Sequence, residues 1–225
     1  MDSRFRRFVT ALALPWLLCL APLPLLAMGE PPPRPSEIPL EVPVGDLGQN
    51  DRLPDPLRSR YRPAPAGAFP VQQAGALGYP LGLKPSEQAP FGWRLADARN
   101  AWRMHTGLDL IAPEGSPVFA VLPGTVRLVD DVGGYGLLVV IDHGLGWQSL
   151  YAHLLDVAVL PGESLVAGQP IGRVGSSGSA TTAHLHFEWR QMRQGRLVAV
   201  DPSPLLQPIG TGPSVAGRAP LPPLP

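Results

Sequence analysis

The sequence contains almost no cysteine. Its single cysteine, Cys19, lies in an apolar run near the start of the chain. The remainder therefore needs no disulfide, and neither a cysteine nucleophile nor a thiolate metal site is expected there. Any metal site in this chain would have to be built from histidine, aspartate or glutamate side chains.

The chain also lacks a surplus of either charge. Lysine and arginine together number 18, as do aspartate and glutamate, so the formal net charge is zero. A nucleic-acid-binding domain usually shows a basic surplus or a basic stripe, and this sequence has neither. The charge balance argues against a nucleic-acid partner and indicates no other partner by itself.

The first residues have the layout of an export signal. Arg4, Arg6 and Arg7 precede a run from Phe8 to Ala27 that is apolar almost throughout. A basic start followed by an apolar segment and a small residue is typical of a signal peptide, so we predict one over residues 1–27. The alternative is a retained membrane anchor, because the run is about long enough to span a bilayer. Three prolines within it disfavour that alternative, since each removes a helix hydrogen bond.

Proline is abundant, and it is concentrated toward the two ends of the chain. Many of the 30 prolines lie in residues 28–74 and 210–225, where few apolar residues are available for burial. We therefore predict a disordered proline-rich linker over residues 28–74 and a proline-rich tail over 210–225. A folded domain is expected between them, over residues 75–209.

Within the expected domain, short apolar runs alternate with Gly- and Pro-containing turns. Examples are the runs 116–122, 125–129, 137–141 and 147–152. This pattern is typical of an all-β sandwich or barrel. No long segment shows the 3.6-residue apolar period of a helix, so few helices are expected.

Four of the five histidines lie in three short clusters, which begin at His105, Tyr151 and His184. Alternate residues of an extended chain share a face, so His105 and Asp109 would face one way, as would His184 and His186. Imidazole and carboxylate groups are good zinc ligands, and a catalytic zinc usually has three protein ligands and one open position. The HExxH helix motif of common zinc proteases is absent, which calls for a different zinc architecture.

The segment from about Phe91 to Leu206 resembles the lysostaphin/LytM-type zinc endopeptidases of metallopeptidase family 23. The motifs that carry the resemblance are spread over the whole segment and occur in the family's order. They include FGWR from Phe91, HTGLD from His105, YAHL from Tyr151, GSSG from Gly175, HLHFE from His184, and Asp201-Pro202.

This resemblance implies an antiparallel β-sandwich, of the duplicated hybrid motif type with few helices, that holds one Zn²⁺ in a narrow groove. It assigns His105, Asp109 and His186 as the metal ligands. His153 and His184 are the expected catalytic residues, one as general base and the other orienting water or stabilising the oxyanion, with the division of roles left open.

Two further polar residues near these motifs are not assigned to catalysis. His143 is expected to be a structural or surface residue. Glu188 shares a strand face with His184 and His186, so a contact with the site is one interpretation. We favour the other, in which Glu188 is a strand residue beyond the site.

The resemblance also implies a function: an exported zinc-dependent endopeptidase that hydrolyses peptide cross-links of bacterial peptidoglycan with metal-activated water and two assisting histidines. The peptide stems and cross-links would be the partners, with no nucleic acid and no membrane contact after signal cleavage. A protein activator of unknown identity is left open. The periplasm is the expected location, with secretion or cell-wall association as alternatives. The alternative is a function of a different class, that of a non-catalytic adaptor that binds peptidoglycan and activates another wall hydrolase.

Overall fold

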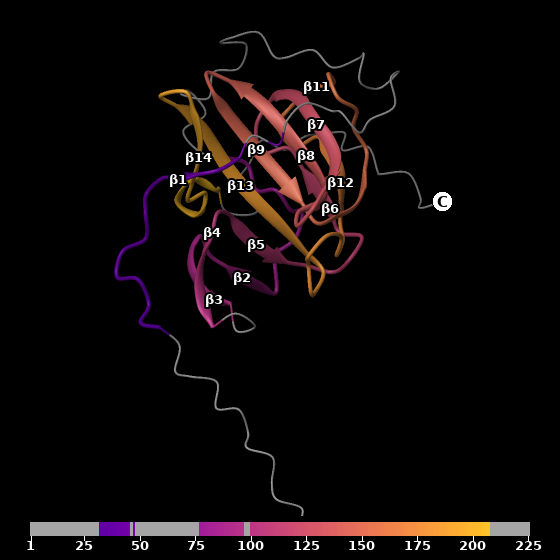
Figure 1. Cartoon of the computed structure of the whole chain (residues 1–225). Coiled ribbons are helices and arrows are strands. Elements are labelled where there is room, and N and C mark those ends of the chain that lie inside the picture. The colour runs from indigo at the N-terminus through magenta and orange to yellow at the C-terminus, as the bar shows by residue number, and fades with distance from the viewer. Residues whose placement is uncertain (1–31, 46, 48–76, 97–99, 208–225) are drawn as a thin grey trace, which may run out of the picture.

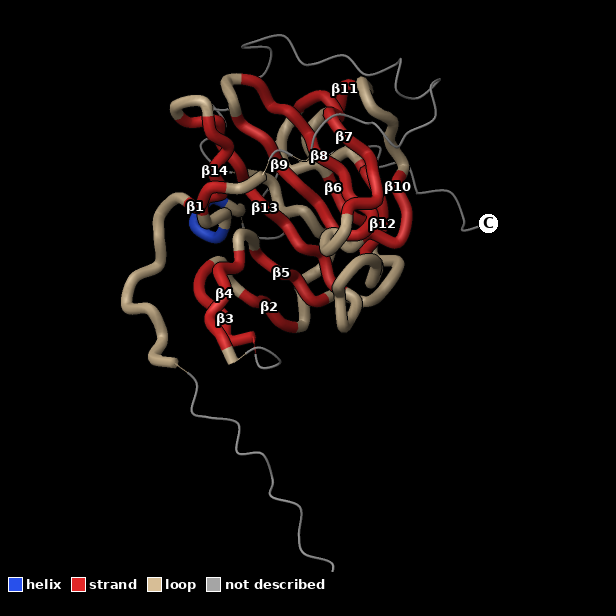
Figure 2. Tube along the Cα trace, in the orientation of Figure 1, coloured by secondary structure: helices blue, strands red, loops and turns tan. Residues whose placement is uncertain are grey.

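A computed structural model of the chain describes residues 32–45, 47, 77–96 and 100–207 (Figure 1). Within these ranges the structure contains strands and one short 3-10 helix at Ser203–Leu205, with no α-helix (Figure 2). The strands are β1 (Val42–Pro43), β2 (Glu87–Ala89), β3 (Gly92–Ala96), β4 (Ala101–His105), β5 (Leu108–Ile111), β6 (Pro117–Phe119), β7 (Gly124–Val132), β8 (Gly136–Gly144), β9 (Trp147–Ala152), β10 (Leu154–Val157), β11 (Ser164–Leu165), β12 (Pro170–Val174), β13 (His184–Arg193) and β14 (Arg196–Val200).

The predicted signal peptide and the proline-rich tail lie outside the described residues. In the part of the chain that the structure does describe, no helix is long and apolar enough to cross a membrane.

The largest sheet is built around β13, its longest strand. The order β1-β14-β13-β9-β8-β7-β11 is antiparallel throughout, and β5 with β2 is attached beside β13. The first half of β13 pairs with β5 and the second half with β14, while β9 runs along its other edge. The start of β13 is thereby enclosed by strands on both sides, which gives a rigid base for the side chains that project from it.

A smaller sheet, ordered β10-β12-β6, packs against the large one through an apolar core. Val139, Tyr151 and Phe187 of the large sheet and Val118 and Ile171 of the small sheet are completely buried in that core. Burial of each such large side chain contributes roughly 1.5–3 kcal/mol. The prediction of an all-β antiparallel sandwich with few helices is confirmed.

The HTGLD stretch departs from the expected single extended segment. His105 is the last residue of β4, which among the described strands pairs only with β3, in a separate two-stranded sheet. Thr106 and Gly107 then turn the chain into β5 of the large sheet, which contains Asp109. His105 and Asp109 therefore approach each other from two different sheets rather than along one strand face.

Part of the predicted linker lies against the domain. Val42 and Pro43 pair with β14 at the edge of the large sheet, a position where a proline's missing N–H costs no hydrogen bond in the ladder. The indole nitrogens of Trp93 and Trp102 donate hydrogen bonds to the carbonyl oxygens of Glu37 (2.8 Å) and Pro32 (2.7 Å). Residues 32–45 thus form a strap along β14 and the β3–β4 hairpin, whereas residues 48–76 lie outside the described chain.

Candidate metal centre and active site

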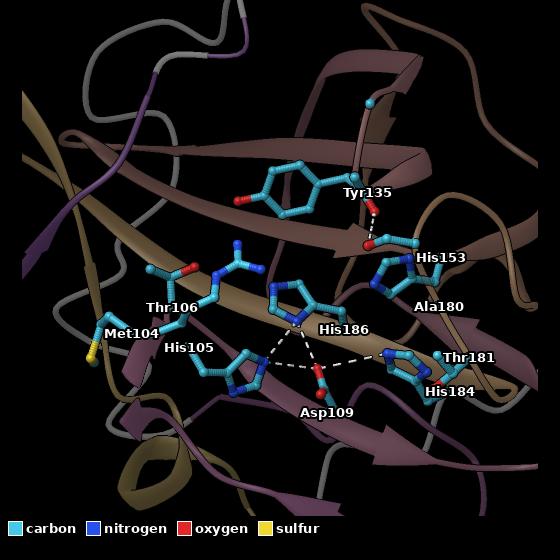
Figure 3. Close-up of a pocket in the computed structure, with 14 residues that line it drawn as sticks. Met104, His105, Thr106, Asp109, Tyr135, His153, Ala180, Thr181, His184 and His186 are labelled. Carbon is cyan, nitrogen blue, oxygen red and sulfur yellow. Dashed lines mark hydrogen bonds and ion pairs between the residues drawn. The ribbon is translucent and has the colours of Figure 1, made fainter. Parts of the chain in front are cut away.

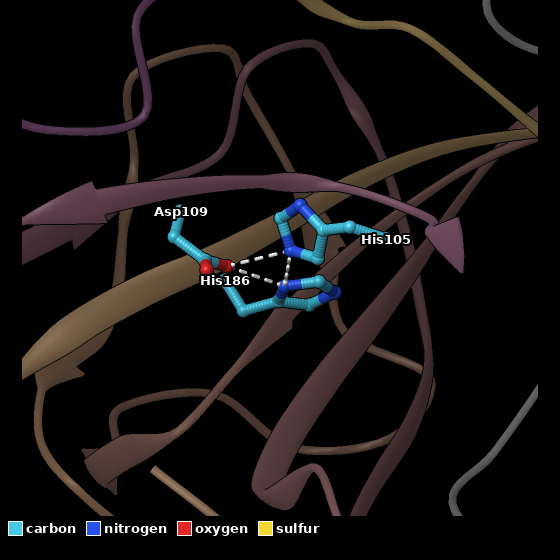
Figure 4. Close-up of side chains that lie close together, drawn as sticks. All are labelled: His105, Asp109 and His186. Carbon is cyan, nitrogen blue, oxygen red and sulfur yellow. Dashed lines mark hydrogen bonds and ion pairs between the residues drawn. The ribbon is translucent and has the colours of Figure 1, made fainter. Parts of the chain in front are cut away.

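Three side chains from three strands converge on one point (Figure 4). Asp109 of β5 lies directly opposite His186 of β13 in the sheet register, and His105 reaches them from the end of β4. Asp109 Oδ1 is 2.7 Å from His186 Nδ1 and 3.0 Å from His105 Nε2, and the two ring nitrogens are 3.1 Å apart. Arg94 Nη1 donates to the other carboxylate oxygen, Oδ2, at 3.0 Å, which leaves Oδ1 directed at the two histidines.

The hydrogen-bond partners of the two rings determine which nitrogens carry hydrogen. His105 Nδ1 lies 2.8 Å from the carbonyl oxygen of Pro90, which can only accept, so the neutral ring has its hydrogen on Nδ1. His186 Nε2 lies 3.0 Å from the Glu188 carboxylate, so its hydrogen lies on Nε2. His105 Nε2, His186 Nδ1 and Asp109 Oδ1 therefore face one another with lone pairs.

Three converging lone pairs require a positive charge between them, supplied either by protons or by a metal ion. Burial opposes a charge on His186, yet contacts with Asp109 and Glu188 outweigh burial and raise its pKa to about 9. Burial raises the pKa of the Asp109 carboxyl, but when protons supply this charge, hydrogen bonds from His105 and His186 outweigh burial and hold that pKa well below the usual range. Two imidazole nitrogens and one carboxylate oxygen form a ligand set that fits a catalytic metal with an open position.

The other two histidines of the motifs, His153 and His184, lie beside this cluster (Figure 3). The centroids of their rings are 4.7 Å apart. His153 Nδ1 faces the carbonyl oxygen of Ser177 at 2.9 Å, and His184 Nδ1 faces that of Thr182 at 2.8 Å. Each neutral ring thus keeps its hydrogen on Nδ1 and has a lone pair on Nε2. His184 Nε2 is 3.8 Å from Asp109 Oδ1.

His153 is held in a strained backbone conformation. Its φ of +60° lies in the left-handed region, which costs a non-glycine residue about 1–3 kcal/mol. The backbone N–H donates to Tyr135 O at 2.9 Å, and the carbonyl accepts from Gly175 N at 3.1 Å. Burial lowers the pKa of the His153 ring to about 4, so the ring is neutral at neutral pH.

All five predicted site residues line one open pocket of about 510 Å³. Its walls come from the β3–β4 hairpin with Arg103 and Met104, from the segment 133–135, and from the segment 179–181. The pocket therefore places a candidate metal centre next to two imidazoles that can accept protons. This arrangement is suited to hydrolysis of a polar bond in a substrate that enters the pocket.

Glu188 belongs to this site, and our preferred interpretation of it as a residue beyond the site is wrong. Its carboxylate is completely buried and lies against His186 Nε2. Thr106, Tyr135 and Arg190 also contact this carboxylate, and none of these three contacts was predicted from the sequence. The alternation of residues 184, 186 and 188 on one strand face was the signal that favoured the other interpretation.

His143 lies elsewhere and is structural, in agreement with prediction. It is completely buried, with Nδ1 2.8 Å from the carbonyl oxygen of Pro123 and Nε2 2.8 Å from Ser149 Oγ. It takes no part in lining the pocket.

The sequence is similar to those of several known proteins. The model of peptidase family M23 matches residues 103–202. DD-carboxypeptidase/endopeptidase Mpg of Neisseria meningitidis serogroup B is 43% identical over 102 residues, which are 45% of this chain and 24% of that protein. Murein hydrolase activator EnvC of Escherichia coli is 37% identical over 147 residues, 65% of this chain and 34% of that protein. The matches thus span about a quarter to a third of these relatives' own lengths.

Among solved structures, the chain is similar to a zinc-containing peptidase from Vibrio cholerae. The TM-score is 0.50 and the sequence identity 29%, over 56% of this chain and 39% of that one.

Proposed function

We propose that the protein is an exported zinc-dependent endopeptidase that hydrolyses peptide cross-links of bacterial peptidoglycan. The premise is that residues 103–202 match the model of peptidase family M23, a family of peptidoglycan hydrolases. The observation that carries the proposal is the site geometry. Three lone-pair donors of zinc-ligand type converge beside two imidazoles whose Nε2 atoms are free to accept protons.

In this proposal His105 Nε2, Asp109 Oδ1 and His186 Nδ1 would hold the zinc ion. The solved neighbour from Vibrio cholerae, a zinc-containing peptidase, supports zinc over other metals. Zinc supplies a Lewis acid that polarises a carbonyl group and lowers the pKa of water toward neutrality. Arg94 holds Oδ2 of the Asp109 carboxylate, so that Oδ1 faces the two histidine ligands.

His153 and His184 would then act as the proton and hydrogen-bond acceptors of the reaction. Because the backbone carbonyls of Ser177 and Thr182 fix their Nδ1 hydrogens, each ring presents Nε2 as an acceptor. One imidazole takes a proton from the attacking water and passes it to the leaving amine. The other imidazole accepts a hydrogen bond from the second O–H of the water and so fixes the orientation of the water. Alternatively, this second imidazole stabilises the oxyanion once it is protonated.

The substrate and location follow from the family and from the amino terminus. Relatives named as a DD-carboxypeptidase/endopeptidase and as a murein hydrolase activator support action on peptidoglycan stem peptides. The apolar run of residues 8–27 supports export, with the periplasm as the site of action. This proposal includes the predicted division of the chain into a signal peptide (1–27), a linker (28–74), a domain (75–209) and a tail (210–225).

A second candidate is an adaptor that activates another wall hydrolase, as the similarity to EnvC suggests. The complete set of three ligand-type donors and two further histidines favours the enzyme, because an adaptor has no need of them.

Digestion of purified peptidoglycan tests the proposal. We expect the protein to convert cross-linked muropeptide dimers into monomers, to stop after chelation, and to recover with about one zinc ion per chain. Chromatography and mass spectrometry of the products would identify the bond that is cut. If the zinc-loaded protein releases nothing but accelerates a separate wall hydrolase, the endopeptidase proposal fails and the adaptor is correct.

A further inference from the structure

We propose that Glu188 is a positioning residue that fixes the metal-binding orientation of His186 and joins the two chain segments that supply the metal ligands. This inference rests on the proposed zinc site.

The surroundings of Glu188 support a specific role for its charge. The side chain has no exposed surface, and a carboxylate at such a position is costly unless every oxygen is paired. Oε1 accepts hydrogen bonds from Thr106 Oγ1 at 2.7 Å and Tyr135 OH at 2.9 Å, and it lies 3.0 Å from His186 Nε2. Oε2 accepts from Arg190 Nε at 2.5 Å, in an ion pair whose partner is also almost completely buried.

These contacts determine which nitrogen of His186 faces the metal site. A neutral imidazole can carry its hydrogen on either nitrogen, and a hydrogen on Nδ1 would point at Asp109 and occupy the ligand position. With an acceptor at Nε2, the hydrogen stays there and the Nδ1 lone pair faces Asp109 and His105. Groups that hold a metal-binding histidine in this way typically contribute 10–100-fold to metal affinity.

The same carboxylate also links separate parts of the site. Thr106 directly follows the ligand His105, so its hydroxyl ties the end of β4 to β13. Tyr135 contacts Glu188 through its hydroxyl, while its backbone carbonyl accepts from the N–H of His153. One carboxylate therefore holds His186 directly, the His105 segment through Thr106, and the His153 backbone through Tyr135.

A purely structural ion pair between Glu188 and Arg190 would predict a different outcome from a positioning role. Its loss would lower the free energy of unfolding without a specific effect on metal affinity. Zinc affinity of folded variants, measured by competition with a chelating dye, separates the two roles.

The test uses the full chain with Glu188→Gln, which keeps the shape and a neutral acceptor, and Glu188→Leu, which keeps neither. Because Glu188→Leu leaves the buried Arg190 charge unpaired, Glu188→Leu/Arg190→Met is made alongside it. Ser149→Ala is the matched control, since Ser149 is completely buried and hydrogen-bonded to His143 away from the pocket. Circular dichroism selects the temperature at which all variants are folded.

We expect zinc affinity to fall in the order wild type, Glu188→Gln, Glu188→Leu/Arg190→Met, with the last weaker than wild type by about 10–100-fold. Ser149→Ala should match wild type in affinity while losing stability. The absorption spectrum of bound Co²⁺ should change in the Glu188 variants and not in the control. A folded Glu188→Leu/Arg190→Met variant whose zinc affinity falls by less than about 10-fold would overturn the inference.

A measurement on the wild type is independent of any folding defect. In the zinc-loaded protein, imidazole ¹⁵N spectra should show a hydrogen on His186 Nε2 and a coordinated Nδ1. Coordination through Nε2 would overturn the inference and leave the proposed function standing. A wild-type protein that binds no zinc would overturn the proposed function together with this inference.

Discussion

At the residue scale, each of the four histidines of the site has one ring nitrogen committed to a fixed acceptor. For His105, His153 and His184 this acceptor is a backbone carbonyl, which no side-chain substitution removes. For His186 it is the carboxylate of Glu188. His186 is therefore the one of these four rings whose hydrogen-bearing nitrogen faces a side-chain acceptor instead of a backbone carbonyl.

The proposed division between ligands and proton-transfer residues predicts that metal binding and cleavage separate by mutation. His186→Ala should lose zinc, because it removes one of three ligands. His184→Ala should keep about one zinc per chain and lose about 10²–10⁴-fold in cleavage rate. Metal analysis and muropeptide assays on the same preparations would show this, and a zinc-free His184→Ala protein would contradict the assignment.

The close surroundings of Gly107 lead to a second prediction about zinc binding. A Cβ at this position would lie 2.6 Å from the carbonyl oxygen of Phe187 and 2.7 Å from Cε1 of His186. Gly107→Ala should therefore displace His186 and weaken zinc binding. Gly133→Ala, in the pocket wall but with open space around the position, is the matched control and should bind zinc normally. Equal zinc affinities in the two variants would rule out the steric argument.

At the scale of elements, the alternation in β13 could be predicted because it is local. Leu185 and Phe187 are buried in the core, while His184 and His186 reach the pocket, as the strand period requires. The break between β4 and β5 at Thr106 could not be predicted in the same way. It depends on which distant strands each one pairs with, namely β3 for β4 and β13 for β5.

The role of Glu188 escaped local reasoning for the same physical reason. Thr106 and Tyr135, which contact its carboxylate, lie 82 and 53 residues away in the chain. The sequence placed Glu188 on the correct face, but only the fold brings these donors to it. Arg190, two residues further along the same strand, was the partner that strand alternation alone could have identified.

The strap over residues 32–45 leads to a prediction at the element scale. Trp93→Phe/Trp102→Phe removes the two indole hydrogen bonds to the backbone of the strap, each worth about 0.5–1.5 kcal/mol at most. The strap should then open more often, so the N–H of Val44, which donates to Leu197 O, should exchange faster with deuterium. Amides of β13 should keep their protection, and unchanged exchange at Val44 would contradict the attachment.

At the scale of the whole molecule, the buried His143 links stability to pH. Burial lowers its pKa in the folded protein to about 4, from an ordinary value of 6.5. Below about pH 6.5 the unfolded chain binds a proton that the folded protein does not, so the free energy of unfolding falls as pH falls toward 4. The full loss attributable to this residue is about 3 kcal/mol.

Denaturant unfolding of wild type and His143→Gln between pH 7 and pH 4, the window set by the two pKa values, tests this link. The variant should be less stable at pH 7, since it disturbs the contacts with Pro123 and Ser149. Its stability should nevertheless fall less steeply with acid than that of wild type. Parallel pH profiles for the two proteins would show that His143 does not titrate in this way.

For the whole molecule, the proposed function requires one zinc ion bound by His105, Asp109 and His186. Anomalous diffraction at the zinc absorption edge from crystals of the protein tests it most directly. We predict a single strong peak per chain, within bonding distance of His105 Nε2, Asp109 Oδ1 and His186 Nδ1. A zinc-supplemented crystal with no peak between these atoms, or with a peak bound by other residues, would contradict the account.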